Sequence, residues 1–200
     1  MFPYLAPYLT AYWGPFRLLG SFLVLIGLGV TAAAIGTWWV LPRAWAFLPR
    51  DQGKPFVKDS EQAKGKPTGA GVIVFAMLVP ILVLVLPPNA QLWELTGCLF
   101  LAMMTGFLDD CSEKPWGQVL KGSLDLLIAL LASLAMCQGR DVIVWWPLLK
   151  GGTGTGGFVL SVWFYVPVAT VLLWWTINAT NCSDGVDGLA GSLSLLSLFY

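Results

Sequence analysis

Long apolar stretches without a charged residue constrain this chain more than any other feature of its sequence. A helix needs about 20 apolar residues to cross the hydrocarbon core of a bilayer, where every backbone polar group must be hydrogen-bonded within the protein. Charge is scarce here, because 11% of the residues are charged and 57% are apolar, whereas an average soluble domain has about 25% charged residues. The sequence therefore predicts an integral membrane protein built from helices.

Five stretches are expected to cross the bilayer, and a sixth begins before the chain ends. The expected spans are residues 18–41, a span within 67–93 that ends near Pro87 and Pro88, a shorter span at 95–108, and then 119–137 and 161–177. The sixth starts near Val186 and is still apolar at Tyr200, so we expect the chain to be the N-terminal part of a longer protein. We predict an all-α polytopic helical bundle, with residues 1–200 forming a single transmembrane domain.

Lysine and arginine are unevenly divided between the predicted loops, and this division assigns sides of the membrane. Cytoplasmic loops carry more of these residues than external loops do. The loops after the first and third spans hold eight of the eleven basic residues, namely Arg43, Arg50, Lys54, Lys58, Lys64, Lys66, Lys114 and Lys121. The sequence thus predicts an external N-terminus, cytoplasmic loops after the first, third and fifth spans, and an external hairpin or interfacial loop at 141–160.

Several classes of protein are excluded by composition. Basic and acidic residues number eleven each, so there is no net positive charge to attract nucleic acid, which is not expected as a partner. Histidine is absent and the four cysteines form no C-x-x-C pair, which argues against a histidine zinc site and a disulfide framework. The first apolar run is too long for the core of a signal peptide, so we interpret it as a retained span.

Two adjacent carboxylates, Asp109 and Asp110, end the predicted third span at its cytoplasmic side. The C-terminal end of a helix carries partial negative charge, so two acids there need a cation nearby. Adjacent helical positions point about 100° apart, so one carboxylate can face a metal-bound diphosphate while its neighbour faces Lys114, Lys121 or an acceptor group. The alternative is a solvated loop with two ordinary surface acids.

A polar strip that begins at Asn178 separates the last two apolar runs. Asn178 and Asn181 are three residues apart, as are Asp184 and Asp187, so each pair shares a face of a helix. Such a strip can bind a polar ligand at the membrane surface. The alternative is a helix N-terminus capped by Ser183 or Asp184, and the two interpretations are compatible because exposed N–H groups at a helix start also bind phosphate.

The segment at 64–71 opens the predicted second span with two lysines, Lys64 and Lys66, and several small residues. Small residues allow close approach of backbones, and lysines can bind phosphate. The alternative is a basic membrane anchor followed by glycines that pack helices.

Lys121 and Asp125 lie four residues apart near the inner end of the predicted fourth span. Ionisable residues within a span are candidates for function, because they are costly to place in a membrane. The alternative is an ion pair with a structural role.

Taken in order, these segments resemble the phospho-N-acetylmuramoyl-pentapeptide transferase family, within the polyprenyl-phosphate sugar-1-phosphate transferases. Besides Phe16-Arg17, the resemblance rests on three motifs. Residues 64–71 are similar to Lys-x-Gly-Thr-Pro-Thr-Met-Gly-Gly, 106–110 to Gly-Phe-x-Asp-Asp, and 178–190 to Asn-Ala-x-Asn-x-Thr-Asp-Gly-x-Asp-Gly-Leu-Ala. The resemblance implies a ten-span fold of which this chain is the N-terminal part, with a further catalytic aspartate and a histidine-rich motif beyond Tyr200.

The activity that the resemblance implies is transfer of phospho-N-acetylmuramoyl-pentapeptide from its UDP conjugate to undecaprenyl phosphate. The products would be lipid I and UMP, the process peptidoglycan synthesis at the cytoplasmic membrane, and the cofactor Mg²⁺. By the resemblance, Asp109 and Asp110 serve the polyprenyl phosphate and the magnesium ion, and Lys121 contacts phosphate. The residues implied to line the UDP-sugar pocket are Lys64, Thr68, Asn178, Asn181, Asp184 and Asp187.

Other functions stay open from the sequence alone. A related enzyme that uses UDP-N-acetylglucosamine or another UDP-sugar would carry similar motifs. A transporter or channel fragment would use Asp125 within the membrane, but the acids cluster at one predicted surface and no internal repeat is visible. A fragment that binds substrate without turning it over is the third alternative, and the choice between a monomer and a homodimer is open.

Overall fold

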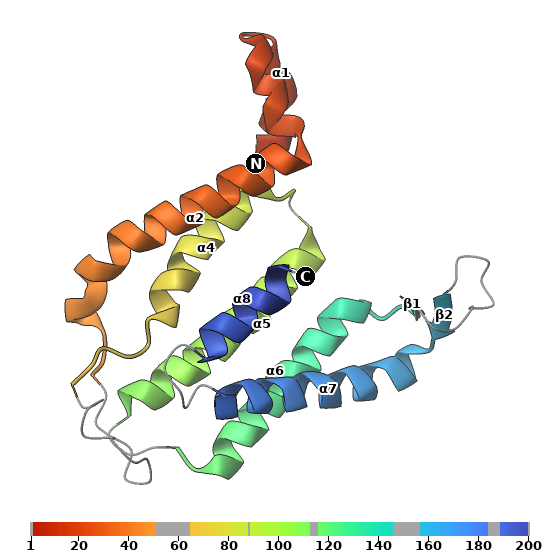
Figure 1. Ribbon diagram of the computed structural model, residues 1–200. Coiled ribbons are helices and arrows are strands. Elements are labelled where there is room, and N and C mark those ends of the chain that lie inside the picture. The colour runs from red at the N-terminus through yellow and green to blue at the C-terminus, as the bar shows by residue number, and fades with distance from the viewer. Residues whose placement is uncertain are drawn as a thin grey trace. The chain divides into compact units, whose positions relative to one another are not determined.

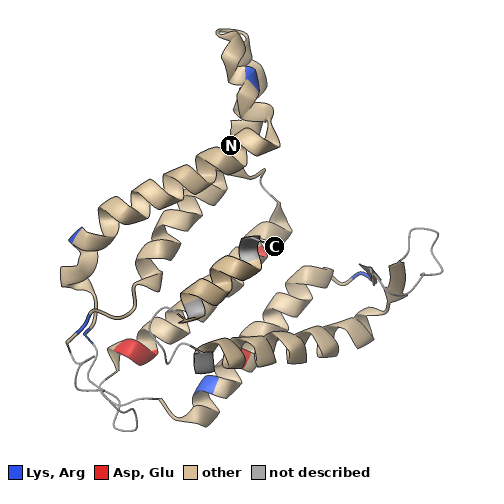
Figure 2. Cartoon of the chain, in the orientation of Figure 1, with Lys and Arg blue, Asp and Glu red and all other residues tan. Residues whose placement is uncertain are grey.

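The computed structural model describes residues 2–50, 65–87, 89–112, 116–145, 157–183 and 189–199. Its chain divides into two compact units, Met1–Trp116 and Gly117–Tyr200. Both units consist mainly of helices (Figure 1), and Figure 2 shows how few charged residues these helices carry.

The first unit is built around three long helices. After α1 (Phe2–Thr10) and the 3-10 helix η1 (Gly14–Gly20) come α2 (Phe22–Ala44), the short η2 (Trp45–Phe47), α4 (Gly71–Val85) and α5 (Ala90–Cys111). Helix α4 packs against both α2 and α5. Gly29 lets α2 approach α4 closely, because a Cβ at this position would lie 3.4 Å from a methyl group of Val85 on α4. On the other side, the rings of Phe75 and Phe100 lie 5.7 Å apart and join α4 to α5.

The second unit is a pair of long helices joined by a hairpin. Helix α6 (Gln118–Cys137) leads into strands β1 (Val142–Trp145) and β2 (Gly157–Leu160), which pair antiparallel with Val142 opposite Leu160. Helix α7 (Val162–Ser183) then packs along α6, and α8 (Leu189–Phe199) follows. The Asp141 carboxylate accepts a hydrogen bond of 3.2 Å from the Val162 amide, which ties the base of the hairpin to the start of α7.

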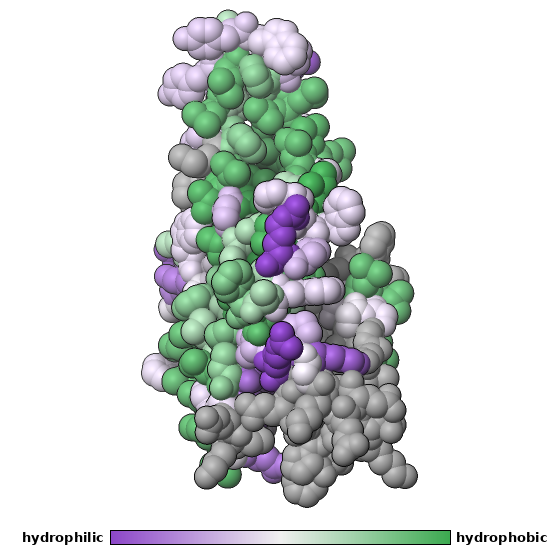
Figure 3. Space-filling view, turned by 90° about the vertical axis from the view of Figure 1, so that its left-hand side faces the viewer, coloured by the Kyte–Doolittle hydropathy of each residue, from purple (hydrophilic) through white to green (hydrophobic). Residues whose placement is uncertain are grey.

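Four helical segments within the described residues are long and apolar enough to cross a membrane: Phe22–Phe47, Ala90–Cys111, Gln118–Cys137 and Val162–Asn181. Their large side chains lie exposed on the outside, with Trp38 80% and Trp163 89% exposed. Hydrophobic residues, shown in green, cover much of the described surface in Figure 3. Lipid is the solvent that suits such a surface, which confirms the predicted all-α polytopic membrane fold.

Several predicted spans differ from the helices that form. Helix α4 ends at Val85, just before the predicted prolines, but its 15 residues reach about 22 Å, less than the roughly 30 Å hydrocarbon core. The prediction of a short third span was wrong, because α5 has 22 residues and starts where the Asn89 side chain accepts a hydrogen bond from the Gln91 amide.

In the second unit, helix α7 continues beyond Ile177 to Ser183, whereas a turn was predicted from Asn178. The predicted hairpin at 141–160 is present as β1 and β2, and its external position stays a prediction.

Candidate functional site

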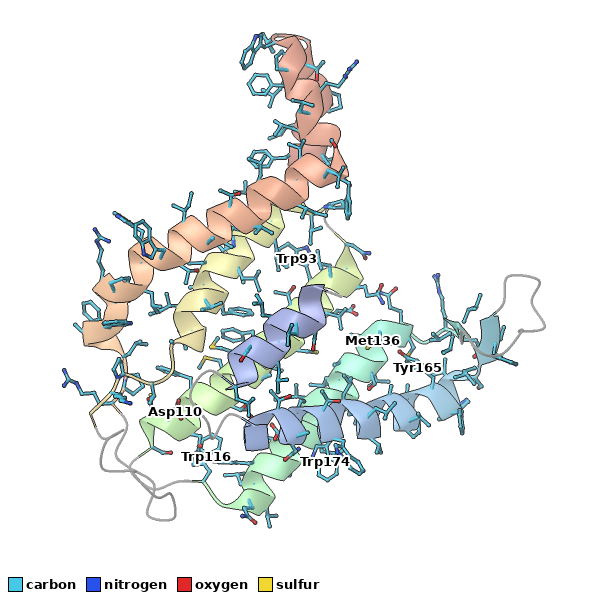
Figure 4. All side chains as sticks on the ribbon, in the orientation of Figure 1. Trp93, Asp110, Trp116, Met136, Tyr165 and Trp174 are labelled. Atoms are coloured by element: carbon cyan, nitrogen blue, oxygen red, sulfur yellow. The ribbon has the colours of Figure 1, made fainter. Side chains whose placement is uncertain are left out.

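The two adjacent acids lie in the last turn of α5, as predicted. Asp109 is half-buried, and its carboxylate accepts a 2.9 Å hydrogen bond from the backbone amide of Trp116. The carbonyl of Asp109 accepts two bonds from Ser112, from the amide at 3.2 Å and from the hydroxyl at 2.7 Å, and these end the helix. Asp110 is exposed, and Figure 4 shows it at this end of α5. One carboxylate is therefore oriented by the backbone while its neighbour faces outward.

The segment before α4 lies against the same end of α5. Gly69 has a φ of +72°, and a Cβ placed there would lie 2.9 Å from the ring of Phe107. The amide of Thr68 donates a 2.8 Å hydrogen bond to the carbonyl of Pro49, and its hydroxyl donates to the same oxygen at 3.4 Å. The structure thus brings Thr68 beside the segment 106–110, which lies about 40 residues further along the chain. Sequence reasoning missed the parts played by Pro49 and Phe107, although the glycines of the motif were a signal of close packing.

Lys121 and Asp125 lie one turn apart in the first half of α6. Lys121 is half-buried, and Asp125 is only 9% exposed. Asp125 shares its face of the helix with Ile128 and Ala129, which are also buried. The two roles considered for this pair, in the reaction or as a structural ion pair, stay predictions.

The amide residues of the polar strip lie in the last turns of α7. The Asn178 side chain is half-buried and donates a 2.9 Å hydrogen bond to the carbonyl of Trp174, and Asn181 is exposed. Ser183 is the last residue of α7, and Asp184, the other residue considered as a helix cap, lies outside the described residues. In these turns the side chains of Thr176, Asn178 and Thr180 each donate a hydrogen bond to a carbonyl four residues earlier, so their polar groups have partners within the helix.

The α6–α7 pair brings Lys121 and Asn178 to the same end. The pair is antiparallel, because Gly122 contacts Trp174, Ser133 contacts Thr170 and Met136 contacts Tyr165. Figure 4 shows Met136 and Tyr165 at one end of the pair and Trp174 near the other. The N-terminal turns of α6 and the C-terminal turns of α7 therefore lie together. Each unit thus collects part of the predicted site at one end of its helices.

Some predicted site residues fall outside the part of the chain that the structure describes. These are Lys64, Asp184 and Asp187, together with the neighbouring Lys114. Of the described ones, Thr68, Asp109 and Asp110 belong to the first unit, and Lys121, Asn178 and Asn181 to the second.

The donor chemistry of Asp109 and Asp110 fits a magnesium ion. Mg²⁺ prefers oxygen ligands and is commonly held by one or two carboxylates, with substrate phosphates and water completing its shell. Within the described ranges no group of three or more His, Cys, Asp or Glu side chains gathers. The adjacent acids, one oriented and one exposed, suit the two-carboxylate mode of binding.

Membrane-length apolar helices with acidic and amide residues at their ends define the class of this protein as an integral membrane protein with polar residues at the ends of its helices. Residues 92–200 match the family described as Glycosyl transferase family 4, so the chain belongs to that family.

The chain is similar to curated proteins that carry the name phospho-N-acetylmuramoyl-pentapeptide-transferase. It is 41% identical to that of Treponema pallidum (strain Nichols) over 194 residues, which cover 96% of this chain and 52% of the relative. It is 30% identical to the Synechococcus elongatus protein of this name over 206 residues, which cover 91% of this chain and 53% of that relative. The chain is also 30% identical to the Helicobacter pylori protein of this name over 186 residues, which cover 86% of this chain and 51% of that relative. The chain spans about half the length of these relatives.

Proposed function

We propose that the protein to which this chain belongs transfers phospho-N-acetylmuramoyl-pentapeptide from its UDP conjugate to undecaprenyl phosphate, with release of UMP. The observation that carries the proposal is the 41% identity, over 96% of the chain, to a relative named for this transfer. The acids at the end of α5 and the amides at the end of α7 supply the polar groups that such substrates need.

The reaction joins two anions, so neutralising their charge is the main task of the site. An oxygen of the lipid phosphate forms a bond to the β-phosphorus of the UDP-sugar. The bond from that phosphorus to the oxygen bridging to the α-phosphorus breaks, and UMP leaves with that oxygen and the electron pair. Lys121, a fixed cation near the start of α6, stabilises the negative charge that develops on the phosphoryl oxygens.

Asp109 and Asp110 act on the phosphate group of the lipid substrate. One of Asp109 and Asp110 takes a proton from this phosphate or orients it, and a covalent aspartyl intermediate is the less favoured alternative. Asp109 and Asp110 would hold a Mg²⁺ ion, which would neutralise charge and polarise phosphoryl oxygens. Asn178 and Asn181 bind polar groups of the UDP-sugar, together with Asp184, Asp187, Lys64 and Thr68.

The proposed location is the cytoplasmic membrane, with these helix ends facing the cytoplasm. A UDP-sugar is water-soluble, whereas the polyprenyl chain is soluble in lipid, so the reaction needs a site at the surface where both can meet. The excess of lysine and arginine in the corresponding loops supports this orientation.

UMP release by the purified full-length protein tests the proposal. We expect Asp109→Asn and Asp110→Asn each to lower kcat by about 100-fold or more, the size of contribution that general acid–base groups make. Asp187→Asn, in the UDP-sugar pocket, should lower kcat/KM for the UDP-sugar. Glu94→Gln is the matched control, because Glu94 is an acid at the opposite end of α5 and its replacement should leave kcat unchanged. Wild-type activity in all three aspartate variants would overturn the proposal. Activity with UDP-N-acetylglucosamine but not the muramoyl-pentapeptide conjugate would reassign the sugar.

Removal of divalent metal is expected to abolish UMP release. EDTA should reduce the rate to background and added Mg²⁺ should restore it, because the charge of the joined phosphates would otherwise be uncompensated. Isothermal titration of Mg²⁺ into the metal-free protein gives a second readout, in which Asp109→Asn lowers affinity and Glu94→Gln does not. Full activity in EDTA would exclude the magnesium ion.

A further inference from the structure

Trp174 connects the two segments of the second unit that carry predicted site residues. Its indole N–H, on α7, donates a 2.9 Å hydrogen bond to the carbonyl of Gly122, the residue after Lys121 on α6. Its own backbone carbonyl accepts the 2.9 Å bond from the Asn178 side chain one turn later. Figure 4 shows Trp174 on α7. A single residue therefore contacts both the turn that carries Lys121 and the side chain of Asn178.

The bond to Gly122 supplies a directional link at this end of the helix pair. A carbonyl oxygen has two lone pairs, so Gly122 can accept the indole N–H and also keep its bond within α6. In the described part of the chain, the side-chain hydrogen bonds Ser133–Thr170 and Met136–Tyr165 also join α6 to α7, nearer the opposite end of the pair. Nothing lies within 4 Å of a Cβ built on Gly122, so steric packing at this glycine does not define the register.

We propose that Trp174 is a positioning residue, which holds α7 in register with α6 so that Lys121 and Asn178 act on the same substrate. The inference rests on the proposed function, since it takes the roles of both residues from there. Removal of the indole N–H takes away the side-chain link between this end of α7 and the turn that carries Lys121, so we expect α7 to shift along α6 there. Such a shift changes the distance between the phosphate-binding cation and the amide that binds the UDP-sugar.

A distance measurement tests the register without relying on catalysis. Spin labels are placed at Val119 and Thr180, which are exposed near this end of α6 and α7, in the full-length protein with its native cysteines replaced. We expect Trp174→Phe to broaden or shift the distribution of distances between the labels. Trp175→Phe is the matched control, because Trp175 is 70% exposed and should leave the distribution unchanged. An unchanged distribution in Trp174→Phe overturns the proposal whether or not the protein proves to be a transferase.

Enzyme kinetics then tests whether the register of α7 against α6 affects the rate of the proposed transfer. We expect Trp174→Phe to lower kcat/KM for the UDP-sugar by about three- to fifteen-fold, the range that corresponds to single interhelical hydrogen bonds in membranes. In a Lys121→Arg background the same substitution should have a much smaller effect, because the site that depends on the register is already altered. An equal loss in both backgrounds would mean that Trp174 acts on folding alone and would overturn the positioning role.

Folding and function are kept apart in this design. The amount of folded protein is read from elution on size exclusion, and Trp174→Leu, which also lacks the N–H donor, replaces Trp174→Phe if that variant aggregates. If the wild-type protein releases no UMP, the proposed function fails, and the distance measurement still decides whether Trp174 sets the register.

Discussion

At the scale of single residues, Gly69 shows how a small side chain fits the segment before α4 against α5. Its φ of +72° lies in the left-handed region that other residues adopt only at a cost, and the ring of Phe107 occupies the space that a Cβ would need. Phe107 precedes Asp109 by two residues, so the contact links Thr68 and Gly69 with the acid-bearing turn. Glycine is therefore required here for both backbone conformation and packing.

The substitution Gly69→Ala is expected to destabilise the protein by about 1–3 kcal/mol, because it adds backbone strain and a steric clash. Thermal unfolding in detergent would measure the effect. Gly71→Ala is the matched control, since Gly71 has no positive φ and a Cβ there meets nothing within 4 Å. Equal stability of the two variants would show that the contact with Phe107 is not retained in solution.

At the scale of secondary-structure elements, α6 and α7 form the best-defined pair in the second unit. The hydroxyl of Thr170 donates a 3.2 Å hydrogen bond to that of Ser133, which in turn donates to the carbonyl of Ala129 at 2.8 Å. Both side chains are buried, with Ser133 0% and Thr170 7% exposed. Because small residues allow helices in a membrane to approach closely, this polar contact can lie within an otherwise apolar interface.

A double-mutant cycle with Ser133→Ala and Thr170→Val should reveal a coupling energy of about 0.6 kcal/mol, and at most about 1.7 kcal/mol, as for other interhelical hydrogen bonds in membranes. Unfolding in mixed micelles provides the free energies. Thr176→Val serves as the control partner, because the Thr176 hydroxyl bonds to Leu172 within its own helix and should show no coupling to Ser133. Additive effects of the Ser133 and Thr170 changes would mean that the hydroxyls do not interact.

At the scale of the whole molecule, the proposed reaction requires that the polar ends of both units face the same side of the membrane. In the first unit this end carries Asp110, and in the second it carries Asn181. Arg140, at the opposite end of α6, lies beside the hairpin and is predicted to be external. The distribution of basic residues along the chain is the basis for this orientation.

Cysteine labelling tests the orientation in right-side-out vesicles. In a protein without native cysteines, Arg140→Cys should react with a membrane-impermeant maleimide added outside. Asp110→Cys and Asn181→Cys should react only after the vesicles are opened. All three residues are exposed, so a difference in labelling reflects the side of the membrane on which a residue lies and not its burial within the protein. Labelling of Asp110→Cys and Asn181→Cys from different sides would rule out a shared site.

The class of fold and the identity of the polar segments could be predicted from the amino-acid sequence alone. Charge-free apolar runs dictate membrane helices because hydrocarbon cannot hydrogen-bond the backbone, and this holds whatever the neighbouring helices are. Asp109 and Asp110 were correctly expected at a helix end, because charged side chains are costly to place within the hydrocarbon. Exact helix limits were less predictable, since α5 begins at a cap formed by Asn89 and α7 continues through Asn178 and Thr180, whose side chains bond within the helix.

Contacts between residues far apart in the sequence could not be predicted and became known from the packing of the helices. The contact between Gly69 and Phe107, the bond from Trp174 to Gly122 and the buried pair Ser133–Thr170 join positions about 40 to 50 residues apart. Their residue types are common in membrane helices and carry no pairing signal of their own. Periodicity along a helix states which residues share a face, but the partner and register of that face depend on how closely the side chains of two helices fit.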